Sequence, residues 1–291
     1  MRLRPLMAAA AALAGAAVSG RPARSGVALV TGSTDGIGKL TARLLAQQGF
    51  AVLLHGRSQR RLDTAREEIL AAAPTARIET YCHDLSLISG AEALAAEVLG
   101  KHSSLDVVVQ NAGVFMQSRV VTSDALESTF AVNVAAPFVL SKRLSPALQQ
   151  PGSRMLMVSS ISQSDGGELD LRSVQCPPAG DFDQYRAYGQ SKRCMAMLSH
   201  ELSLRASPER GGPVILSCDP GTVNTKMLLA GWGACGVPLE AATDEYELVK
   251  SCEPARHGKY FVGLRESRCH PDVYDAAKRG ALWALLEAVT R

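Results

Sequence analysis

Short apolar runs alternate with longer amphipathic segments along most of the chain. The apolar runs are rich in Val, Leu and Ile, and they predict β-strands over 27–30, 51–54, 77–81, 105–109, 154–158, 214–218 and 260–262. Between them, apolar residues at helical spacing predict helices over 38–48, 60–73, 90–99, 126–149, 188–205 and 276–290. This alternation favours an α/β fold, a doubly wound parallel sheet of about seven strands with helices on both faces.

Two segments depart from the alternation. Residues 163–184 are polar and rich in Gly, Pro and Asp, which predicts an insertion loop. Residues 227–237 are apolar and rich in Gly, which is typical of a mobile lid, although an ordinary packed loop is the alternative. We therefore predict a single domain over 25–291, with an insertion loop at 163–184 and a substrate lid at 226–250.

The composition is that of a globular protein, since 46% of the 291 residues are apolar and 20% are charged. The formal net charge is +3, and the Lys and Arg residues are spread along the chain, which argues against nucleic-acid binding. We expect a small-molecule partner instead. The seven cysteines are an odd number at wide spacing without a CxxC pair, a pattern that favours reduced thiols and supports no metal site.

The amino terminus has a different character. Residues 1–34 contain four arginines and no acidic residue, around an Ala-rich run at 6–18. That run is too short to span a bilayer, which takes roughly 20 residues. For residues 1–24 an organellar transit peptide, a secretory signal and a flexible tail all stay open. A targeting signal would predict a mitochondrion, a plastid or the endoplasmic reticulum, and a tail would predict the cytoplasm.

A glycine-rich turn follows the first predicted strand and opens the first predicted helix. Gly32, Gly36 and Gly38 lie in the sequence Gly-Ser-Thr-Asp-Gly-Ile-Gly. Glycines at such a turn let the backbone approach a pyrophosphate, and the helix amino end offers unpaired N–H donors to its negative charge. Because strand, turn and helix come in the right order, the segment predicts dinucleotide binding.

A tyrosine and a lysine lie four positions apart in the helix predicted over 188–205. At that spacing Tyr188 and Lys192 share a face, so the ammonium can lie near the phenol. A neighbouring cation favours the phenolate of a tyrosine, whose ordinary pKa of about 10 makes it a poor base at neutral pH. Ser160, at the end of the preceding strand, supports a chemical interpretation of the pair over a solvated helix face.

Six further motifs follow the glycine turn in matching strand contexts. They are Asp84-Leu85, Asn111-Ala112-Gly113, Asn133, Ser159-Ser160, Tyr188-Gly189-Gln190-Ser191-Lys192 and Pro220-Gly221-Thr222-Val223-Asn224-Thr225. Together they resemble the short-chain dehydrogenase/reductase family over roughly 25–263. The long interval between Ser160 and Tyr188 resembles its retinol-dehydrogenase-like branch. The resemblance implies a Rossmann-like fold and an NAD(P)-dependent oxidoreductase acting on CH–OH or C=O groups.

The resemblance also implies a role for individual residues. Tyr188 would give a proton to the substrate oxygen or take one from it, Ser160 would orient that oxygen, and Lys192 would hold the nicotinamide ribose. Asn133 would hold a relay water behind Lys192. The candidate cofactor-binding residues, including the glycine turn, are Gly32, Ser33, Asp35, Gly36, Ile37, Gly38, Arg57, Asp84, Leu85, Asn111, Ala112, Gly113, Tyr188, Lys192, Pro220, Gly221, Val223 and Thr225.

The end of the second predicted strand bears on the choice of cofactor. NAD enzymes place an acid there, which would repel the 2′-phosphate of NADP. The chain instead has Arg57, a planar cation suited to a phosphate, with Ser58 and His55 beside it. We expect NADPH/NADP+ to be preferred over NADH, with a surface arginine as the alternative interpretation. Asp35 is a complication in the glycine turn, where many NADP-preferring members carry a base; Lys39 follows just after it.

Asp219 is a departure from the branch, which usually has a histidine before Pro-Gly. It could alter contacts with the substrate or cofactor, or cap the following turn. We expect hydride transfer between NADPH and a carbonyl or alcohol carbon of a lipophilic substrate, enclosed by residues 114–119, 165–185 and 227–237. An NADPH-sensing regulatory binding protein is the main alternative, and a sugar epimerase or dehydratase is a more distant one. Contact with a membrane surface and homo-oligomers stay open.

Overall fold

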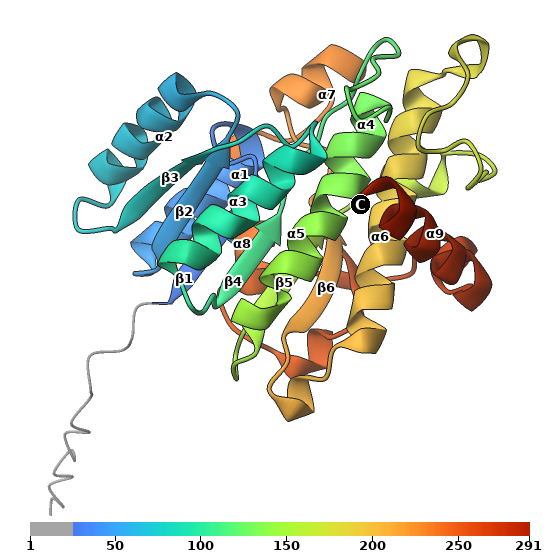
Figure 1. Ribbon diagram of the computed structural model, residues 1–291. Coiled ribbons are helices and arrows are strands. Elements are labelled where there is room, and N and C mark those ends of the chain that lie inside the picture. Colours follow the sequence, from blue (N-terminus) through green and yellow to red (C-terminus); the bar gives the residue numbers. More distant parts are fainter. Residues whose placement is uncertain (1–25) are drawn as a thin grey trace, which may run out of the picture.

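Eight strands form one sheet in the order β3-β2-β1-β4-β5-β6-β7-β8 in the computed structural model, which describes residues 26–291 (Figure 1). The first seven strands are parallel, and β8 pairs antiparallel with β7. The strands are β1 Val27–Val30, β2 Ala51–Gly56, β3 Ile78–Cys82, β4 Val107–Gln110, β5 Arg154–Val158, β6 Val214–Asp219, β7 Tyr260–Val262 and β8 Arg265–Ser267. The predicted fold class is confirmed, and the predicted leader at 1–24 lies outside the described residues.

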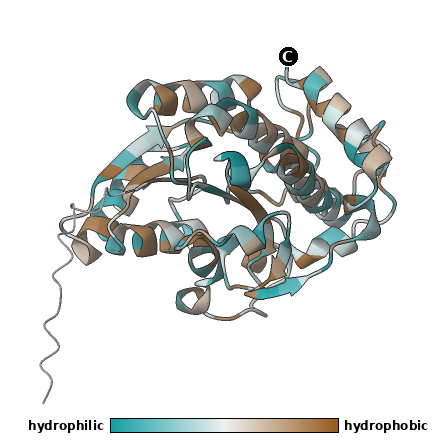
Figure 2. Cartoon of the chain, turned by 90° about the horizontal axis from the view of Figure 1, so that it is seen from below, coloured by the Kyte–Doolittle hydropathy of each residue, from teal (hydrophilic) through white to brown (hydrophobic). Residues whose placement is uncertain are grey.

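Helices cover both faces of this sheet. They are α1 Gly36–Gln47, α2 Gln59–Ala72, α3 Ile88–Lys101, α4 Ser128–Phe130, α5 Ala136–Leu144, α6 Gln184–Arg205, α7 Lys226–Gly231, α8 Asp244–Val249 and α9 Ala276–Val289. Apolar residues of α3, α5, α6 and α9 form one core cluster with the sheet, and those of α1, α2 and α8 form a second one on the opposite face. Figure 2 shows apolar strands between helices that also carry hydrophilic positions.

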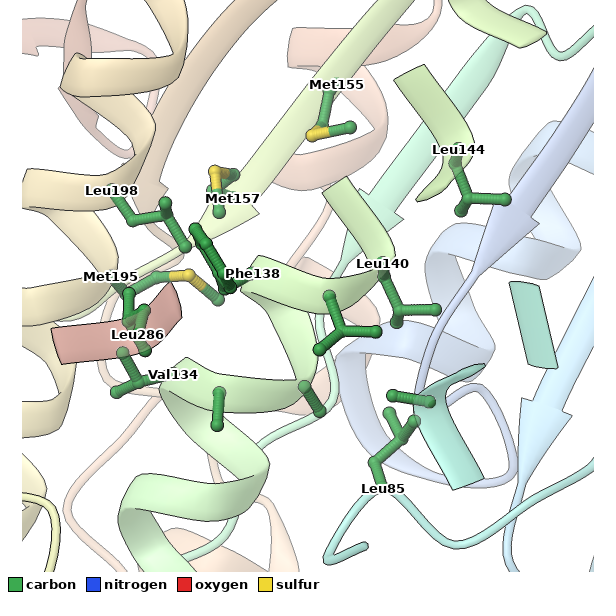
Figure 3. Close-up of a cluster of buried hydrophobic side chains, with 14 of the residues drawn as sticks. Leu85, Val134, Phe138, Leu140, Leu144, Met155, Met157, Met195, Leu198 and Leu286 are labelled. Atoms are coloured by element: carbon green, nitrogen blue, oxygen red, sulfur yellow. The ribbon is translucent and has the colours of Figure 1, made fainter. Parts of the chain in front are cut away.

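Alternate residues of β1, β2, β4, β5 and β6 enter opposite core clusters, because successive side chains in a strand point to opposite faces. Leu29 of β1 belongs to the cluster of α3, α5, α6 and α9, while its neighbours Ala28 and Val30 belong to the other. In Figure 3, Phe138 of α5 lies close to Met157 of β5. Both faces of the sheet are therefore buried, as a parallel sheet requires.

The strand predictions agree closely with the structure, and the helix predicted over 126–149 does not. That segment is divided into α4, a π-helical turn at Ala131–Ala135, α5 and a 3-10 turn at Ser145–Leu148. Its nearly continuous apolar sequence hides the extra residue that a π-turn inserts. In addition, β8, α7 and α8 are elements that we did not predict. Within residues 26–291, no helix combines the length and apolar character needed to cross a bilayer.

The strand order reverses beside β1, which pairs with β2 on one side and with β4 on the other. At such a reversal the connections leave in opposite directions, and a crevice opens at the carboxyl ends of the strands. The glycine turn after β1 and the Asn111-Ala112-Gly113 motif after β4 both lie at this edge. The fold therefore brings motifs about 80 positions apart into one place.

Candidate active site

The glycine turn is fixed by an asparagine from the neighbouring strand end. Asn111 donates from Nδ2 to the carbonyl oxygens of Thr31 at 2.7 Å and Gly32 at 3.2 Å. A Cβ atom at Gly38 would lie 2.2 Å from that same Nδ2, so a larger residue would force the two segments apart. Gly32 itself has φ +66°, a conformation that favours glycine.

The turn opens into a cavity of about 630 Å³ at the carboxyl ends of the strands. Eighteen of the twenty sequence-predicted site residues line it: Gly32, Asp35, Gly36, Ile37, Gly38, Arg57, Asp84, Leu85, Asn111, Ala112, Gly113, Ser160, Tyr188, Lys192, Pro220, Gly221, Val223 and Thr225. The other two, Ser33 and Asn133, are fully buried behind the lining. The structure thus gathers residues from seven separate segments around one space.

Tyr188 and Lys192 lie in the second and third turns of α6, with the Lys192 Nζ 5.6 Å from the centre of the Tyr188 ring. Lys192 donates from Nζ to the carbonyl oxygen of Val158, at the end of β5, at 2.9 Å. The Ser159 hydroxyl donates to the Lys192 carbonyl oxygen at 2.7 Å, which ties α6 to the end of β5. Ser160, next along the chain, hydrogen-bonds the Tyr188 hydroxyl.

Burial has the largest effect on the pKa values of Tyr188 and Lys192. Burial raises the pKa of Tyr188 to about 12, and the hydrogen bond with Ser160 lowers it only in part. Burial also lowers the pKa of Lys192 to about 8, against the charge of Glu245, which raises it. We expected the cation to favour the phenolate, but desolvation penalises the charged form of both groups more strongly. At neutral pH the phenol is therefore protonated and the ammonium is charged.

Asn133 lies in the π-helical turn, and its side chain is bonded to the surrounding chain. Its Oδ1 accepts a hydrogen bond from the Val114 amide at 2.8 Å. Its Nδ2 donates to the Val114 carbonyl oxygen at 3.0 Å and to the Ser191 hydroxyl at 3.0 Å. These bonds connect α6, beside Lys192, to the segment that follows Gly113. The side chain thus positions two walls of the cavity from behind.

His55 is unsuited to the phosphate contact that we considered for it. Its Nδ1 accepts from the Gly32 amide at 3.2 Å, and its Nε2 lies 3.1 Å from the His83 carbonyl oxygen. Burial lowers the pKa of His55 to about 4, so the ring is neutral at physiological pH. Arg57, by contrast, is exposed and lines the cavity.

Three cations lie beside the glycine turn, and one of them, Lys226, comes from α7, which we did not predict. Lys39 pairs with Glu68 at 2.6 Å. Arg61 and Lys226 both line the cavity and both contact Asp35 Oδ2, at 3.1 Å and 2.5 Å. Burial raises the pKa of Asp35, but hydrogen bonds from Lys226 and the Gly36 amide outweigh it and lower the pKa below its ordinary value.

Two buried acids face the same cavity. Asp219 accepts a hydrogen bond from the Gly221 amide at 3.1 Å, the capping contact that we considered for it, and burial raises its pKa. Glu245 of α8 is fully buried and accepts from the Thr41 hydroxyl at 3.2 Å. Its Oε1 has no hydrogen-bond partner among residues 26–291, and burial raises the pKa of this carboxyl to about 7.

Each of the three predicted substrate segments contributes to the lining. Val114 comes from the first, Asp165 from the insertion loop, and Met227, Leu228, Trp232 and Cys235 from the third. The insertion loop is tied to α6 by the buried Arg193, which donates to the carbonyl oxygens of Gln163 at 2.9 Å and Gly167 at 2.8 Å. The start of the insertion loop is therefore held in place by Arg193, the residue that follows Lys192 in α6.

Three charged lining residues were not assigned a role from the sequence: Arg61, Lys226 and Glu245. A signal existed for two of them, because Arg61 is four positions after Arg57 and Lys226 directly follows the Pro-Gly motif that ends at Thr225. For Glu245 no sequence pattern pointed to burial, since it lies in a polar run. All seven cysteines are free, and residues 26–291 contain no group of three or more His, Cys, Asp or Glu arranged to hold a metal.

Comparison with known proteins finds similarity to dehydrogenases and oxidoreductases. A family model described as short chain dehydrogenase matches residues 26–170. An uncharacterised oxidoreductase of Emericella nidulans is 30% identical over 267 residues, covering 90% of this chain and 95% of that protein. A chloroplastic short-chain dehydrogenase of Brassica napus is 27% identical over 277 residues, covering 88% of this chain and 86% of that one.

Solved structures share the fold. A protein of Mycobacterium paratuberculosis aligns with a TM-score of 0.73 at 23% identity, over 91% of this chain and 93% of that one. A Shigella flexneri protein described as a short chain dehydrogenase complexed with NADP aligns with a TM-score of 0.65 at 21% identity, over 82% and 97% of the two chains. At these identities the likeness extends to the fold alone.

Proposed function

This chain belongs to the short-chain dehydrogenase/reductase family and is an NAD(P)-dependent oxidoreductase acting on CH–OH or C=O groups; we propose that it reduces carbonyl compounds with NADPH, using Tyr188 as the general acid. The observation that carries the proposal is the position of Tyr188, Lys192 and Ser160 in the same cavity as the glycine turn. A Cβ atom at Gly113 would lie 3.4 Å from Lys192 Nζ, so glycine leaves that cation accessible from the cavity.

The residues present fit a nicotinamide dinucleotide. The glycine turn and the amino end of α1 offer N–H groups to a pyrophosphate, and Lys192 Nζ offers a cation to the ribose hydroxyls. The bound nicotinamide would supply or accept the hydride. Asp84, Leu85 and the Asn111-Ala112-Gly113 segment would enclose the adenine and ribose half, and Pro220 to Thr225 would enclose the nicotinamide half.

Tyr188 and Ser160 would handle the substrate oxygen. In the direction of reduction the Tyr188 phenol donates its proton to that oxygen, and Ser160 donates a hydrogen bond that orients it. The pKa of about 12 keeps the phenol protonated at neutral pH, which suits reduction better than oxidation. Charged Lys192 stabilises the phenolate that forms, and Asn133 holds the walls on either side in register.

A preference for NADPH rests on the cations at the end of β2. Arg57 and Arg61 line the cavity beside the glycine turn, and there is no acid at the end of β2 to repel a 2′-phosphate. We propose that residues 226–250 act as the lid and residues 163–184 as a fixed wall around a lipophilic substrate. Because one relative is named as chloroplastic, a plastid remains one of the locations proposed for this protein.

The test is a titration of the full chain with NADPH and NADH, followed by turnover of a panel of aldehydes, quinones and retinal monitored by cofactor absorbance. Tighter binding of NADPH and oxidation of NADPH by at least one carbonyl compound are expected. Binding without turnover across the panel would instead favour the NADPH-sensing alternative. Tighter binding of NADH would remove the argument from Arg57.

A further inference from the structure

Four aromatic rings meet where the substrate would enter. The Trp232 ring centre lies 4.7 Å from that of Phe115, 5.5 Å from that of Tyr185 and 5.7 Å from that of Tyr188. Phe115 also lies 5.4 Å from Tyr185 and 5.7 Å from Tyr188, the latter edge-on. The proposed proton donor thus forms one side of an aromatic cluster, and the other rings come from three different segments.

Trp232 is held in this position by the end of α7. Tyr185 donates from its hydroxyl to the Gly231 carbonyl oxygen at 2.9 Å, and Gln117 donates from Nε2 to the Ala230 carbonyl oxygen at 2.9 Å. A Cβ atom at Gly231 would lie 3.1 Å from the Phe115 ring, so glycine allows α7 to approach that ring closely. Each segment that contributes a ring therefore also contacts the backbone beside Trp232.

One face of the cluster is left open. The Trp232 side chain is 40% exposed and lines the cavity together with Tyr188. The other tryptophan, Trp283, packs edge-on against Phe138, and Arg205 stacks over its ring at 3.7 Å. Other apolar residues that line the same cavity are Met227, Leu228 and Ile161. An aromatic surface beside the group that bonds the substrate oxygen is suited to a flat ring.

We propose that this enzyme is selective for carbonyl substrates with a planar aromatic ring within one or two bonds of the reacting carbon. The ring stacks or packs edge-on against Trp232, with Phe115 behind, while the carbonyl oxygen accepts from Tyr188. This proposal rests on the function proposed above, since it assigns Tyr188 as the proton donor. One aromatic pair of this kind is expected to give about a fivefold preference over a saturated ring of similar size.

The substrates that test it are phenylacetaldehyde and cyclohexylacetaldehyde. A methylene separates the ring from the carbonyl in both, so the two carbonyls have similar intrinsic reactivity and the rings differ in planarity and π-electrons. The expected ratio of kcat/KM is about 5 or more in favour of the phenyl compound. Trp232→Phe is expected to keep most of this ratio, and Trp232→Leu to bring it close to 1. Leu264→Ala, at an exposed leucine between β7 and β8 and outside the proposed lid, is the control and should leave the ratio unchanged.

Binding of the unreactive analogues phenylacetamide and cyclohexylacetamide to the NADPH complex, measured by calorimetry, separates this proposal from the proposed function. Equal kcat/KM for the two aldehydes would overturn the aromatic selectivity and leave the reductase assignment intact. A preference for phenylacetamide without turnover of either aldehyde would support aromatic recognition and contradict the reductase assignment. Absence of both turnover and amide preference would overturn both.

Discussion

Lys226, the first residue of α7, lies 2.5 Å from Asp35, in the turn that opens α1 191 positions earlier in the chain. Arg61 contacts the same carboxylate oxygen at 3.1 Å. The contact joins the proposed lid to the proposed cofactor turn. The Asp35 carboxylate thus holds two cations that could otherwise bind a cofactor phosphate. Removal of this carboxylate should therefore change the affinity for the cofactor.

We predict that Asp35→Asn tightens NADPH binding about two- to fivefold at low ionic strength, because Arg61 and Lys226 lose a competing anion. Asn is the chosen replacement because it can still cap the amino end of α1, as Asp35 does through the Gly36 amide. Fluorescence titration with both cofactors measures the effect. Weaker NADPH binding, or an equal gain for NADH, would show that the carboxylate does not compete with a phosphate.

Arg57→Ala should weaken NADPH binding by about tenfold or more and leave NADH binding nearly unchanged. The reason is the loss of a charge-assisted hydrogen bond to the 2′-phosphate, which NADH lacks. Arg60→Ala removes a nearby exposed arginine that is not part of the cavity lining, and it serves as the matched control. The same loss of affinity for both cofactors would indicate a general electrostatic effect.

Tyr188→Phe should lower kcat by about 10²-fold or more, because general acid catalysis typically contributes that much or more. NADPH affinity should stay within about twofold of the parent, since the ring and its packing are kept. Stopped-flow measurement of hydride transfer at saturating NADPH gives the rate. A variant with most of the parent's kcat would exclude Tyr188 as the proton donor.

We predict that the buried carboxyl of Glu245 makes the stability of the fold depend on pH. Its carboxyl has a pKa of about 7 in the folded chain against an ordinary value of 4.5, so the folded state binds the proton more tightly. The contribution of this carboxyl to the free energy of unfolding is therefore fully present below pH 4.5, and it is lost as the pH rises towards 7 and above. Glu245→Gln removes this loss, so the variant should gain up to about 3 kcal/mol over the parent at pH 8 relative to pH 5.

Denaturant unfolding of both proteins at pH 5 and pH 8 measures that difference. Glu240→Gln, at an exposed neighbour in the 3-10 turn Leu239–Ala241, leaves Glu245 in place, so its difference in stability from the parent should be the same at both pH values. If Glu245→Gln and the parent differ by the same amount at both pH values, the buried carboxyl does not titrate in this range.

The predicted strands at 27–30, 154–158 and 260–262 agree residue for residue with β1, β5 and β7. Continuous apolar runs bounded by Gly, Ser or polar residues carry enough local information for this, because both faces of a parallel sheet are buried. The glycine turn, Tyr188 and Lys192 were predicted for a similar reason, since their spacing is itself the signal.

The elements that sequence reasoning missed depend on distant contacts. α7 and α8 have six residues each, too few for a helical period to be recognised, and Gln117 and Tyr185 hold the end of α7 through contacts with its last two residues. The π-turn at Asn133 is stabilised by Val114 and Ser191, which lie far away in sequence. The local sequence gives no information about such distant partners. The walls of the site could therefore be located from the sequence, but their geometry could not be predicted.

The short strand β8 has a consequence for how this protein behaves at high concentration. It covers the last edge of the sheet with three residues, of which Arg265 and Glu266 are exposed. A short and charged edge is a poor template for pairing with another chain. Without it, the apolar strand Tyr260–Val262 would present its open hydrogen-bonding groups to neighbouring molecules and promote aggregation. Three residues remote from the cavity therefore help to protect this edge of the sheet against pairing with other molecules.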